Sequence, residues 1–476
     1  MKSAKMAQRL AEEIEQDIVR NHSAGDHLGT ETVLMERYGV SRSILREALM
    51  LVAVTGLGEI RRGHSGGLFA STPSLATVAA SLQASFSAAA DDPLELNRTR
   101  HALEDVMLIL AVDRFERERI GDALALIARL EGAVRRNARM ALASDVIHLI
   151  AQQCGNPFIA VVVLALTSIA IDGLTRQRSD PEAMMALGDR MLELRFEQLR
   201  AVLAGDAGRA LVANAQLHET HVAHRALPPI AAADDRAAAG DGRPIVAPFG
   251  VGQCEKLAEV VARRIRNRIA GERLDEGAYL GSEAELMLRY GVSRAVFREA
   301  VRLLERHALV RMARGKHGGL RVHVPTPDAV VTASVLSLRN LRIEERHVHE
   351  FGSAFGLIVV ERLAADPVRR SAPQVGELLR SLIVVRDVPL SELARAHFEM
   401  LTGLCGGQAL QTLGRILARF EGSGIEPAGE VATVREVLAA PVEDLIAAIA
   451  SGDTALARRR MMIVQRSGAR VRMRPR

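Results

Sequence analysis

A six-residue segment occurs twice in this chain without change, because residues 37–42 and residues 289–294 both read Arg-Tyr-Gly-Val-Ser-Arg. About forty further residues around each copy align without a gap, and they include an Arg-Glu-Ala triplet and a later Arg-Gly-x-x-Gly-Gly-Leu segment. Chance does not preserve such a pattern. The chain therefore contains one structural module twice, and its fold has to accommodate both copies.

The length of the chain leaves room for further domains beside the two modules. At 476 residues it exceeds what one core usually supports, and a prior of about 150 residues per domain suggests roughly three or four domains. Two copies of a two-domain unit fit this number. Hydrophobic residues make up 48% of the chain and aromatic residues only 3%, and this composition, rich in Ala and Leu, favours helix over strand.

The charge of the whole chain says little, but its distribution is informative. The net charge of +5 rests almost entirely on arginine, since lysine occurs at only four positions, and an arginine bias can reflect the base composition of a genome. Residues 1–70 contain nine basic and nine acidic side chains, whereas residues 251–324 contain fifteen basic and nine acidic ones. The second module should therefore dominate any non-specific attraction to phosphate.

The cysteines and the apolar segments indicate a cytoplasmic protein. The three cysteines are isolated and odd in number, which argues against a disulfide framework: Cys154, Cys254 and Cys405. The beginning of the chain lacks the apolar core of a signal peptide. The longest apolar run, Phe158 to Ile171, is too short to cross a bilayer and predicts a buried helix. We therefore expect no membrane partner.

The spacing of apolar residues and the positions of helix-capping and turn residues predict the same order of elements twice. The order is an amphipathic helix, two short helices, a glycine-rich hairpin and then long helices. The stretch 228–250, rich in Ala, Asp, Gly and Pro, reads as a linker. The expected modules are residues 1–73 and 251–326, and the expected all-helical domains are residues 74–227 and 327–476. A Cys-Gly pair before an apolar helix occurs in both helical domains, at Cys154 and Cys405, so the duplication spans them too.

The capping residues of both modules predict a helix, a tight turn and a second helix. In each module a hydroxyl residue can cap the first helix, a glycine can end it in the left-handed conformation, and a serine can cap the second helix. These residues are Thr30, Gly39 and Ser41 in the first module and Ser282, Gly291 and Ser293 in the second. Only the second module completes a capping box, through Glu285. This order is the helix-turn-helix plan.

The second helix of each module places two arginines on one face near its start. The pairs are spaced by four residues: Arg42 with Arg46, and Arg294 with Arg298. In helix-turn-helix proteins this part of the helix meets base edges and phosphates in the major groove, and guanidinium groups suit both. The second module adds Arg302 to the same helix. Apolar residues on other faces should seat the helices on their cores: Leu45, Leu49, Val52, Phe297, Val301 and Leu304. The alternative is that the arginines form a solvated face.

A glycine-rich hairpin follows each second helix. We expect strands at residues 57–60 and 68–70 in the first module and at residues 309–312 and 320–324 in the second. The glycines between them allow another molecule to approach the backbone, so the hairpin should act as a wing. The candidate contacts to a groove or a phosphate are His64, Gly66, Lys316, His317 and Gly318. For the two histidines an exposed turn is the alternative.

The helix pair with its Val-Ser-Arg-x-x-x-Arg-Glu-Ala motif and glycine-rich wing resembles the winged helix-turn-helix of the GntR transcription regulators. The helical region after it resembles the FadR-type C-terminal ligand-binding domain (FCD) of that family. The resemblance implies a mainly α protein, here with two winged helix-turn-helix domains and two all-α FCD-like bundles. It also implies a regulator, usually a repressor, that binds double-stranded operator DNA as a dimer and responds to a small-molecule effector, often a carboxylate.

The FCD resemblance also implies where an effector should bind. Such domains commonly hold a metal between an Asp and three His residues, and the effector-site candidates in this chain are Arg100, Asp145, His148 and His218. The set is incomplete, because Arg195 or its neighbour stands where a further His is expected, and in the second half only His397 matches. We therefore expect no cofactor, a divalent metal in the first helical domain being the alternative. Arg100 could pair with a carboxylate, or it could be a surface arginine beside Glu104.

The leading hypothesis is a transcription regulator in which one chain carries two DNA readers, and covalent linkage makes engagement of the second reader intramolecular. The chain could act as an intrachain pseudo-dimer or pair with a second copy as a homodimer. In a second hypothesis only the second module reads DNA, and the first is a structural or partner-binding module. A helical metal-dependent enzyme is the third, but the chain shows no nucleophile with a base, no complete ligand set and no phosphate loop, so we expect no enzyme.

Overall fold

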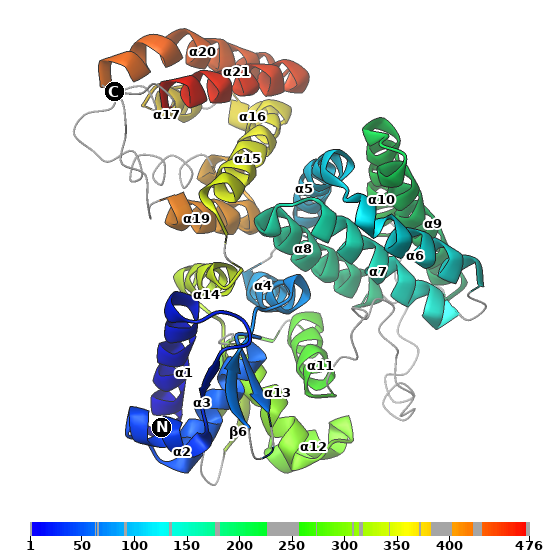
Figure 1. Ribbon diagram of the computed structural model, residues 1–476. Helices are drawn as coiled ribbons and strands as arrows, with labels where there is room; N and C mark the ends of the chain where they lie inside the picture. Colours follow the sequence, from blue (N-terminus) through cyan, green and yellow to red (C-terminus); the bar gives the residue numbers. More distant parts are fainter. Residues whose placement is uncertain are drawn as a thin grey trace. The chain divides into compact units, whose positions relative to one another are not determined.

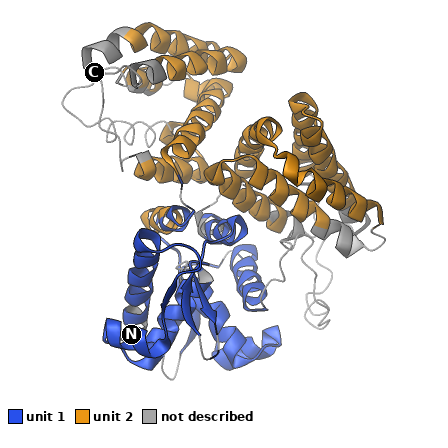
Figure 2. Ribbon diagram, in the orientation of Figure 1, with its two compact units in different colours: residues 1–88, 245–326, 336–343 blue, residues 89–244, 327–335, 344–476 orange. Residues whose placement is uncertain are grey.

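In a computed structural model the chain divides into two compact units (Figure 2). Unit 1 comprises residues 1–88, 245–326 and 336–343, and unit 2 comprises residues 89–244, 327–335 and 344–476. The structure describes residues 2–472 except 62, 64–65, 90–92, 133–135, 177–180, 226–256, 273, 307–308, 314–317, 342, 371–372, 382–401 and 422–430. The predicted linker at 228–250 lies outside the described residues. Unit 1 thus contains both modules together with residues 74–88 and 336–343 of the predicted helical domains, and unit 2 contains most of the described helices of those domains.

Unit 1 consists of two winged helices with the same element order (Figure 1). The first contains α1 (Lys2–Asn21), β1 (His27–Gly29), α2 (Glu31–Tyr38), α3 (Arg42–Val54), β2 (Gly58–Arg61) and β3 (Gly67–Ala70). The second contains α11 (Leu257–Gly271), β4 (Tyr279–Gly281), α12 (Glu283–Tyr290), α13 (Arg294–Arg306), β5 (Val310–Ala313) and β6 (Gly319–Val322). The helices α4 (Leu75–Ala89) and α14 (Pro327–Arg339) follow them. The predicted mainly α fold with two winged helix-turn-helix domains is confirmed.

Each winged helix contains a three-stranded antiparallel sheet, in the orders β1-β3-β2 and β4-β6-β5. The hairpins β2–β3 and β5–β6 lie within about two residues of the predicted strands. The third strand of each sheet was not predicted, because β1 and β4 have only three residues each and show no readable alternation. These short strands tie the segment before the first short helix to the wing.

The core of each winged helix seats its second short helix. Leu45, Leu49 and Val52 of α3 are buried in the first core together with residues of α1. In the second core the corresponding residues are Phe297, Val301 and Leu304 of α13. All six predicted seating residues are therefore buried. Because these positions follow helical spacing, the arginines between them are directed away from the core.

Within unit 1 the helix that follows each wing, α4 or α14, also contacts the other half of the chain. Ala84 of α4, which follows the first winged helix in sequence, lies in the core cluster of the second winged helix. In the same unit, the hydroxyl groups of Ser81 and Ser337 form a hydrogen bond of 2.9 Å. Segments from both halves therefore complete one compact unit.

Unit 2 is all-helical in its described residues. The helices of the first half are α5 (Pro93–Arg114), the short 3-10 helix η1 (Arg117–Arg119), α6 (Ile120–Gly132), α7 (Arg136–Gln153), α8 (Pro157–Arg176), α9 (Pro181–Leu203) and α10 (Ala207–Arg225). Those of the second half are α15 (Glu345–Ala365), α16 (Pro367–Arg370), α17 (Pro373–Ser381), α19 (Gln408–Glu421), α20 (Val431–Ser451) and α21 (Thr454–Arg472). The predicted apolar run forms the buried part of α8. None of the helices described here has the length and apolar character to cross a bilayer.

The two helical halves of unit 2 meet through α5 and α8 on one side and α15 on the other. The rings of Phe158 and Phe351 stack at 4.2 Å with an angle of 5° between their planes, and both side chains are fully buried. The Arg114 guanidinium pairs with Glu350 at 2.5 Å. The amide of Asn156 donates a hydrogen bond of 2.9 Å to the same carboxylate. Apolar stacking and a shared carboxylate thus join one half to the other.

Candidate nucleic-acid interface

The capping chemistry positions the two short helices of each winged helix. Thr30 Oγ1 accepts a hydrogen bond of 3.4 Å from the backbone N–H of Val33, and Ser282 forms the predicted capping box with Glu285. The backbone N–H of Val296 donates to Ser293 Oγ at 3.4 Å. For Ser41 the prediction needs correction: its backbone has the extended cap conformation, but its side chain makes no capping hydrogen bond. The start of α3 therefore relies on backbone geometry alone.

A glycine in the left-handed conformation makes each tight turn, as predicted. Gly39 has φ 61° and Gly291 has φ 64°, values that residues with a Cβ adopt only at a cost. The chain can then reverse within two residues and begin the second helix. This turn sets the angle at which α3 and α13 leave their cores.

In the first winged helix, one carboxylate holds both predicted arginines. Arg46 donates to Glu31 through Nε at 2.6 Å and through Nη2 at 3.1 Å. Arg42 Nε lies 3.2 Å from the same carboxylate. Each arginine side chain is 64% exposed, whereas that of Glu31 is 28% exposed. The two guanidinium groups are therefore gathered at the start of α3 and remain open to solvent.

The second winged helix repeats this arrangement with different residues around it. Arg294 donates to Glu283 through Nε at 2.9 Å and through Nη2 at 3.3 Å. Arg298 Nε donates to Glu283 at 2.9 Å. The Arg294 and Arg298 side chains are 65% and 55% exposed. The same triad of one Glu and two Arg thus occurs at both recognition-helix starts.

The ion pairs favour the charged forms of Glu31, Glu283, Arg46 and Arg294. Hydrogen bonds from Arg294 and then from Arg298 lower the pKa of Glu283 to about 2. The pKa of Glu31 is also lowered, first by its hydrogen bond from Arg46. The pKa values of Arg46 and Arg294 are raised by the same pairing. Each triad therefore has one net positive charge, held in a fixed place on an exposed surface.

Sequence reasoning missed Glu31 and Glu283, although a signal for them exists. Both are the first residue of their helix, directly after the capping residue, and each copy has a glutamate there. An acidic residue in a first helical turn is usually explained by the helix dipole. Its second role, as a partner for arginines eleven to fifteen residues later, depends on how the two short helices cross.

The wing candidates divide into described and undescribed residues. His64, Lys316 and His317 lie outside the described residues, so their roles stay predictions. Gly66 donates its backbone N–H to Gly63 O at 2.9 Å and thereby closes the first wing turn, and Gly318 precedes β6. Gly66 lies directly before β3 in the same way.

The neighbouring glycines Gly67 and Gly319 have a different role from the predicted one. A Cβ on Gly319 would lie 2.8 Å from the carbonyl oxygen of Gly281 and would also strike the Tyr279 ring. A Cβ on Gly67 would strike the Gly29 carbonyl in the same way. The group that lies close to each of these backbones is a strand of the same sheet, β1 beside Gly67 and β4 beside Gly319.

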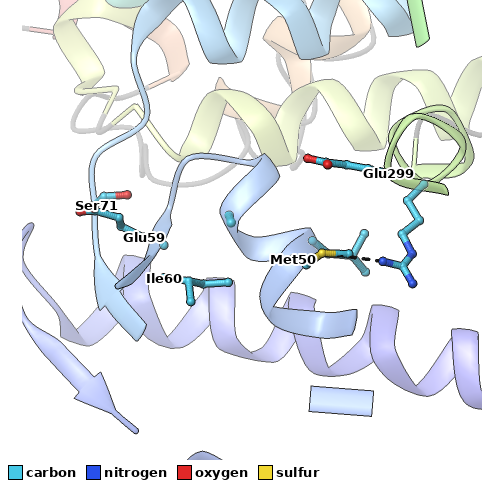
Figure 3. Close-up of a pocket in the computed structure, with 9 residues that line it drawn as sticks. Met50, Glu59, Ile60, Ser71 and Glu299 are labelled. Atoms are coloured by element: carbon cyan, nitrogen blue, oxygen red, sulfur yellow. Dashed lines mark hydrogen bonds between the residues drawn. The ribbon is translucent and has the colours of Figure 1, made fainter. Parts of the chain in front are cut away.

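Arg302, predicted to contact DNA, lies against the first winged helix. Its Nη1 donates to Met50 Sδ at 3.8 Å, a contact that Figure 3 marks beside the labelled Met50. Its Nη2 is 3.9 Å from Glu47 Oε1. A cavity of about 510 Å³ adjoins this contact and is lined by Met50, Leu51, Ala53, Gly58, Glu59, Ile60, Ser71, Glu299 and Arg302. A role of Arg302 on DNA stays a prediction, whereas its contact with the first winged helix is a feature of unit 1.

Asp145, His148 and His218, the effector candidates beside Arg100, each contact another group of the chain. Asp145 pairs with Arg129 at 3.5 Å, and Nδ1 of His148 bonds the Ser144 carbonyl oxygen of its own helix at 2.7 Å. His218 bonds Asn97 at 3.0 Å. Among the described residues no three His, Cys, Asp or Glu side chains form a group that could hold a metal. His397 lies outside those residues.

Arg100 is not the surface arginine that was considered as an alternative. Its side chain is fully buried and pairs with Glu104, which is also fully buried. Arg195, which stands near the place of an expected His, is 5% exposed and pairs with the other oxygen of the same carboxylate. The position of Arg100 beside Glu104 on one helical face follows from helical spacing, but its burial does not, because spacing gives the neighbours on one helix and not the helices that cover them.

Comparison with known proteins agrees with this geometry in the two winged helices. The model of the family described as bacterial regulatory proteins, gntR family, matches residues 6–66 and 257–318. A 66-residue part of the chain, 14% of its length, is 41% identical to the Uxu operon regulator of Haemophilus influenzae and covers 24% of that protein. The chain thus aligns with about a quarter of this relative. A solved structure, Streptococcus agalactiae GntR, matches 46% of this chain and 99% of its own at 20% identity with a TM-score of 0.30.

Proposed function

We propose that this protein is a transcription regulator that binds double-stranded operator DNA through both winged helices. The observation that supports the proposal most strongly is the pair of exposed guanidinium groups at the start of each second helix, held by Glu31 in one copy and by Glu283 in the other. The N-terminal part of a recognition helix is the part that enters the major groove. The matches to the gntR family model cover these same helices.

We further infer that one chain acts as an intrachain pseudo-dimer. Two observations support this: both winged helices belong to one compact unit, and the two helical halves share the Phe158–Phe351 stack. Surfaces that two separate chains could use for pairing are then used within one chain. A single chain would present two linked readers to two half-sites, and binding would not depend on the association of two chains.

The finer parts of the proposal rest on the resemblance of the helical region to FCD domains. They are repression as the sign of regulation, control by a small-molecule effector such as a carboxylate, and a location in the cytoplasm. Regulation without enzymatic activity is part of the same proposal. The alternative that the first winged helix is structural is favoured by one observation, the balanced charge of residues 1–70, with nine basic and nine acidic side chains.

Selection from random-sequence DNA followed by fluorescence anisotropy tests the proposal. The full chain should select a sequence with two half-sites, and one chain should bind per duplex over a wide range of protein concentration. The double variant Arg294→Ala/Arg298→Ala should lower the affinity and reduce the slope of log K against log salt concentration by about 2, one for each lost phosphate contact. Arg263→Ala/Arg264→Ala on α11, which removes the same charge from the same winged helix, is the control.

The double variant Arg42→Ala/Arg46→Ala separates the two hypotheses about the first winged helix. A reduced salt slope and the loss of preference for one half-site support two readers. An unchanged slope and an unchanged site preference support a structural first winged helix. If the full chain selects no sequence and its affinity for DNA is the same with and without the arginine pairs, the DNA-binding proposal is wrong.

A further inference from the structure

The core of the first helical domain contains a charged cluster that the proposed DNA binding does not use. Glu104 accepts hydrogen bonds from Arg100 through one carboxylate oxygen and from Arg195 through the other. Gln198 donates to the same carboxylate at 3.2 Å. Relative exposures of 0% for Arg100, 0% for Glu104 and 5% for Arg195 show that all three side chains are buried. Two guanidinium groups thus clamp one carboxylate inside the helical bundle.

The cluster is charged and has one positive charge in excess. Burial by itself raises the pKa of Glu104, but the charges of Arg195 and Arg100 outweigh it and lower this pKa to about 2. Burial lowers the pKa of Arg100 to about 10, so this group is also charged near neutral pH. Nη2 of Arg100 is buried without a hydrogen-bond partner. His221 adds no charge beside Arg100 near neutral pH, because burial lowers its pKa to about 3.

The second helical domain shows that this fold does not require such a cluster. The helix α15 begins as many residues after β6 as α5 begins after β3. A Gly-Asp pair precedes the last helix in both domains. On this alignment Gly352 and Gly356 correspond to Arg100 and Glu104. The counterparts of Arg195, Gln198 and Asn214 are Val442, Leu445 and Met461. A Cβ on Gly356 would lie 2.7 Å from the terminal methyl of Met461. An apolar side chain therefore fills the corresponding place.

A buried ion cluster is costly to keep where an apolar core can take its place. Replacing buried ion pairs by well-packed apolar residues is often neutral or stabilising, whereas removing one partner is strongly destabilising. The geometry around Glu104 is also that of ligand recognition, since two guanidinium groups and an amide converge on one carboxylate. In this core the carboxylate belongs to the chain itself.

We propose that Glu104 is a built-in ligand, whose carboxylate occupies a binding site for small carboxylates formed by Arg100 and Arg195. The first helical domain is then insensitive to external carboxylates at this place, and an effector of this class has to bind elsewhere. Removal of the Glu104 side chain opens the site to formate or acetate. The inference goes beyond the proposed function and does not depend on DNA binding, so the two can fail separately.

Thermal unfolding of the full-length Glu104→Ala variant tests the proposal. Its Tm should fall by roughly 10 °C, because two buried guanidinium groups lose their partner. Sodium formate and sodium acetate should restore most of this loss in a saturable manner, and sodium chloride at the same concentration should restore little. The Tm of the wild-type protein should respond equally to acetate and chloride.

Two control variants separate this site from a general salt effect. Glu350→Ala also removes a carboxylate from an arginine, but Arg114 and Glu350 are 33% and 29% exposed, so water can replace the lost group. Acetate should give this variant no saturable recovery beyond that of chloride. The double variant Glu104→Ala/Arg195→Met should lose the response to acetate, since only one guanidinium remains.

Two results would overturn the proposal. The first is a folded Glu104→Ala variant, judged by circular dichroism, whose Tm responds to acetate and chloride alike. The second is a saturable response of the wild-type protein to acetate that Arg100→Met abolishes, because the site would then be open despite Glu104. The wild-type measurement can contradict the proposal even if the alanine variant does not fold in either salt, and it needs no DNA.

Discussion

Arg302 of the second winged helix lies 3.9 Å from Glu47 of the first, with its Nη2 facing Oε1 of the carboxylate. Both residues belong to a recognition helix, Glu47 to α3 and Arg302 to α13. In both helices the contacting residue lies on the C-terminal side of the exposed arginine pair. One arginine can therefore link the two winged helices without covering the surfaces that are proposed to read DNA.

The first prediction concerns this link. Arg302→Ala should loosen the two winged helices relative to each other, since it removes a partly exposed ion pair of about 0.2–1 kcal/mol and the contact with Met50. Spin labels at Ser43 and Ala295, both exposed near the helix starts, in a background without Cys254, should give a broader distance distribution. Arg264→Ala on α11 removes an exposed arginine of the same domain and should leave the distribution unchanged. Equal widths for wild type and Arg302→Ala contradict the prediction.

The second prediction compares the two readers. Arg294→Ala should weaken operator binding more than Arg42→Ala, although both arginines pair with one glutamate in the same way. The reason is the surrounding charge, since residues 251–324 contain fifteen basic and nine acidic side chains whereas residues 1–70 are balanced at nine of each. Anisotropy titrations at matched salt measure the difference. Equal losses, or the reverse order, show that local contacts outweigh the field of the domain.

The third prediction concerns the glutamate that gathers the arginines. Glu31→Gln should increase the non-specific affinity for DNA at low salt, because a carboxylate next to the phosphates is lost. It should also lower the ratio of specific to non-specific affinity, because the two guanidinium groups lose the partner that fixes them. Glu36→Gln changes the same charge at the exposed last turn of α2 and is the matched control. A specificity ratio that falls equally in both variants contradicts a positioning role for Glu31.

The fourth prediction separates two glycines of the second winged helix. Gly291→Ala should destabilise the domain by about 1–2 kcal/mol, since φ is 64° but a Cβ there meets nothing within 4 Å. Gly319→Ala should cost roughly 1–3 kcal/mol more, because its Cβ would strike the Tyr279 ring and the Gly281 carbonyl. Hydrogen exchange of the β4–β6 backbone amides in the full chain measures this. Equal protection in the two variants rules out the packing argument.

The fifth prediction is a loss of stability on acidification. Burial lowers the pKa of His221 from its ordinary value of about 6.5 to about 3. The unfolded chain therefore binds a proton that the folded chain does not, and stability falls as the pH decreases from about 6.5 towards 3. At pH 5 this amounts to about 2 kcal/mol. Urea unfolding at pH 7.5 and pH 5 should give a smaller loss for His221→Leu than for wild type.

Glu104 acts in a lower window. Its pKa is lowered from about 4.5 to about 2, so its contribution is present above pH 4.5 and is lost as the pH falls through that range. A loss between pH 7.5 and pH 5 that His221→Leu does not reduce would assign the acid sensitivity to other groups.

The sequence predicted the winged helices well, because their signals are local. Capping residues, left-handed glycines and helical spacing act within a few residues, so Gly39, Gly291 and the buried face of α3 could be located without a structure. The exception among the caps is Ser41, whose side chain makes no hydrogen bond although its backbone has the cap conformation. A residue type that can cap does not determine which rotamer it adopts.

The chain by itself determined the duplication, the turn chemistry and the presence of two arginines on one face of each second helix. Only the tertiary structure decided which groups the arginines of this chain contact. Glu31 and Glu283 pair with the exposed arginines, Met50 and Glu47 contact Arg302, and Glu104 pairs with the buried Arg100. The physical reason is range. Backbone preferences are set by neighbours along the chain, whereas burial and charge pairing depend on segments up to hundreds of residues apart that packing brings together.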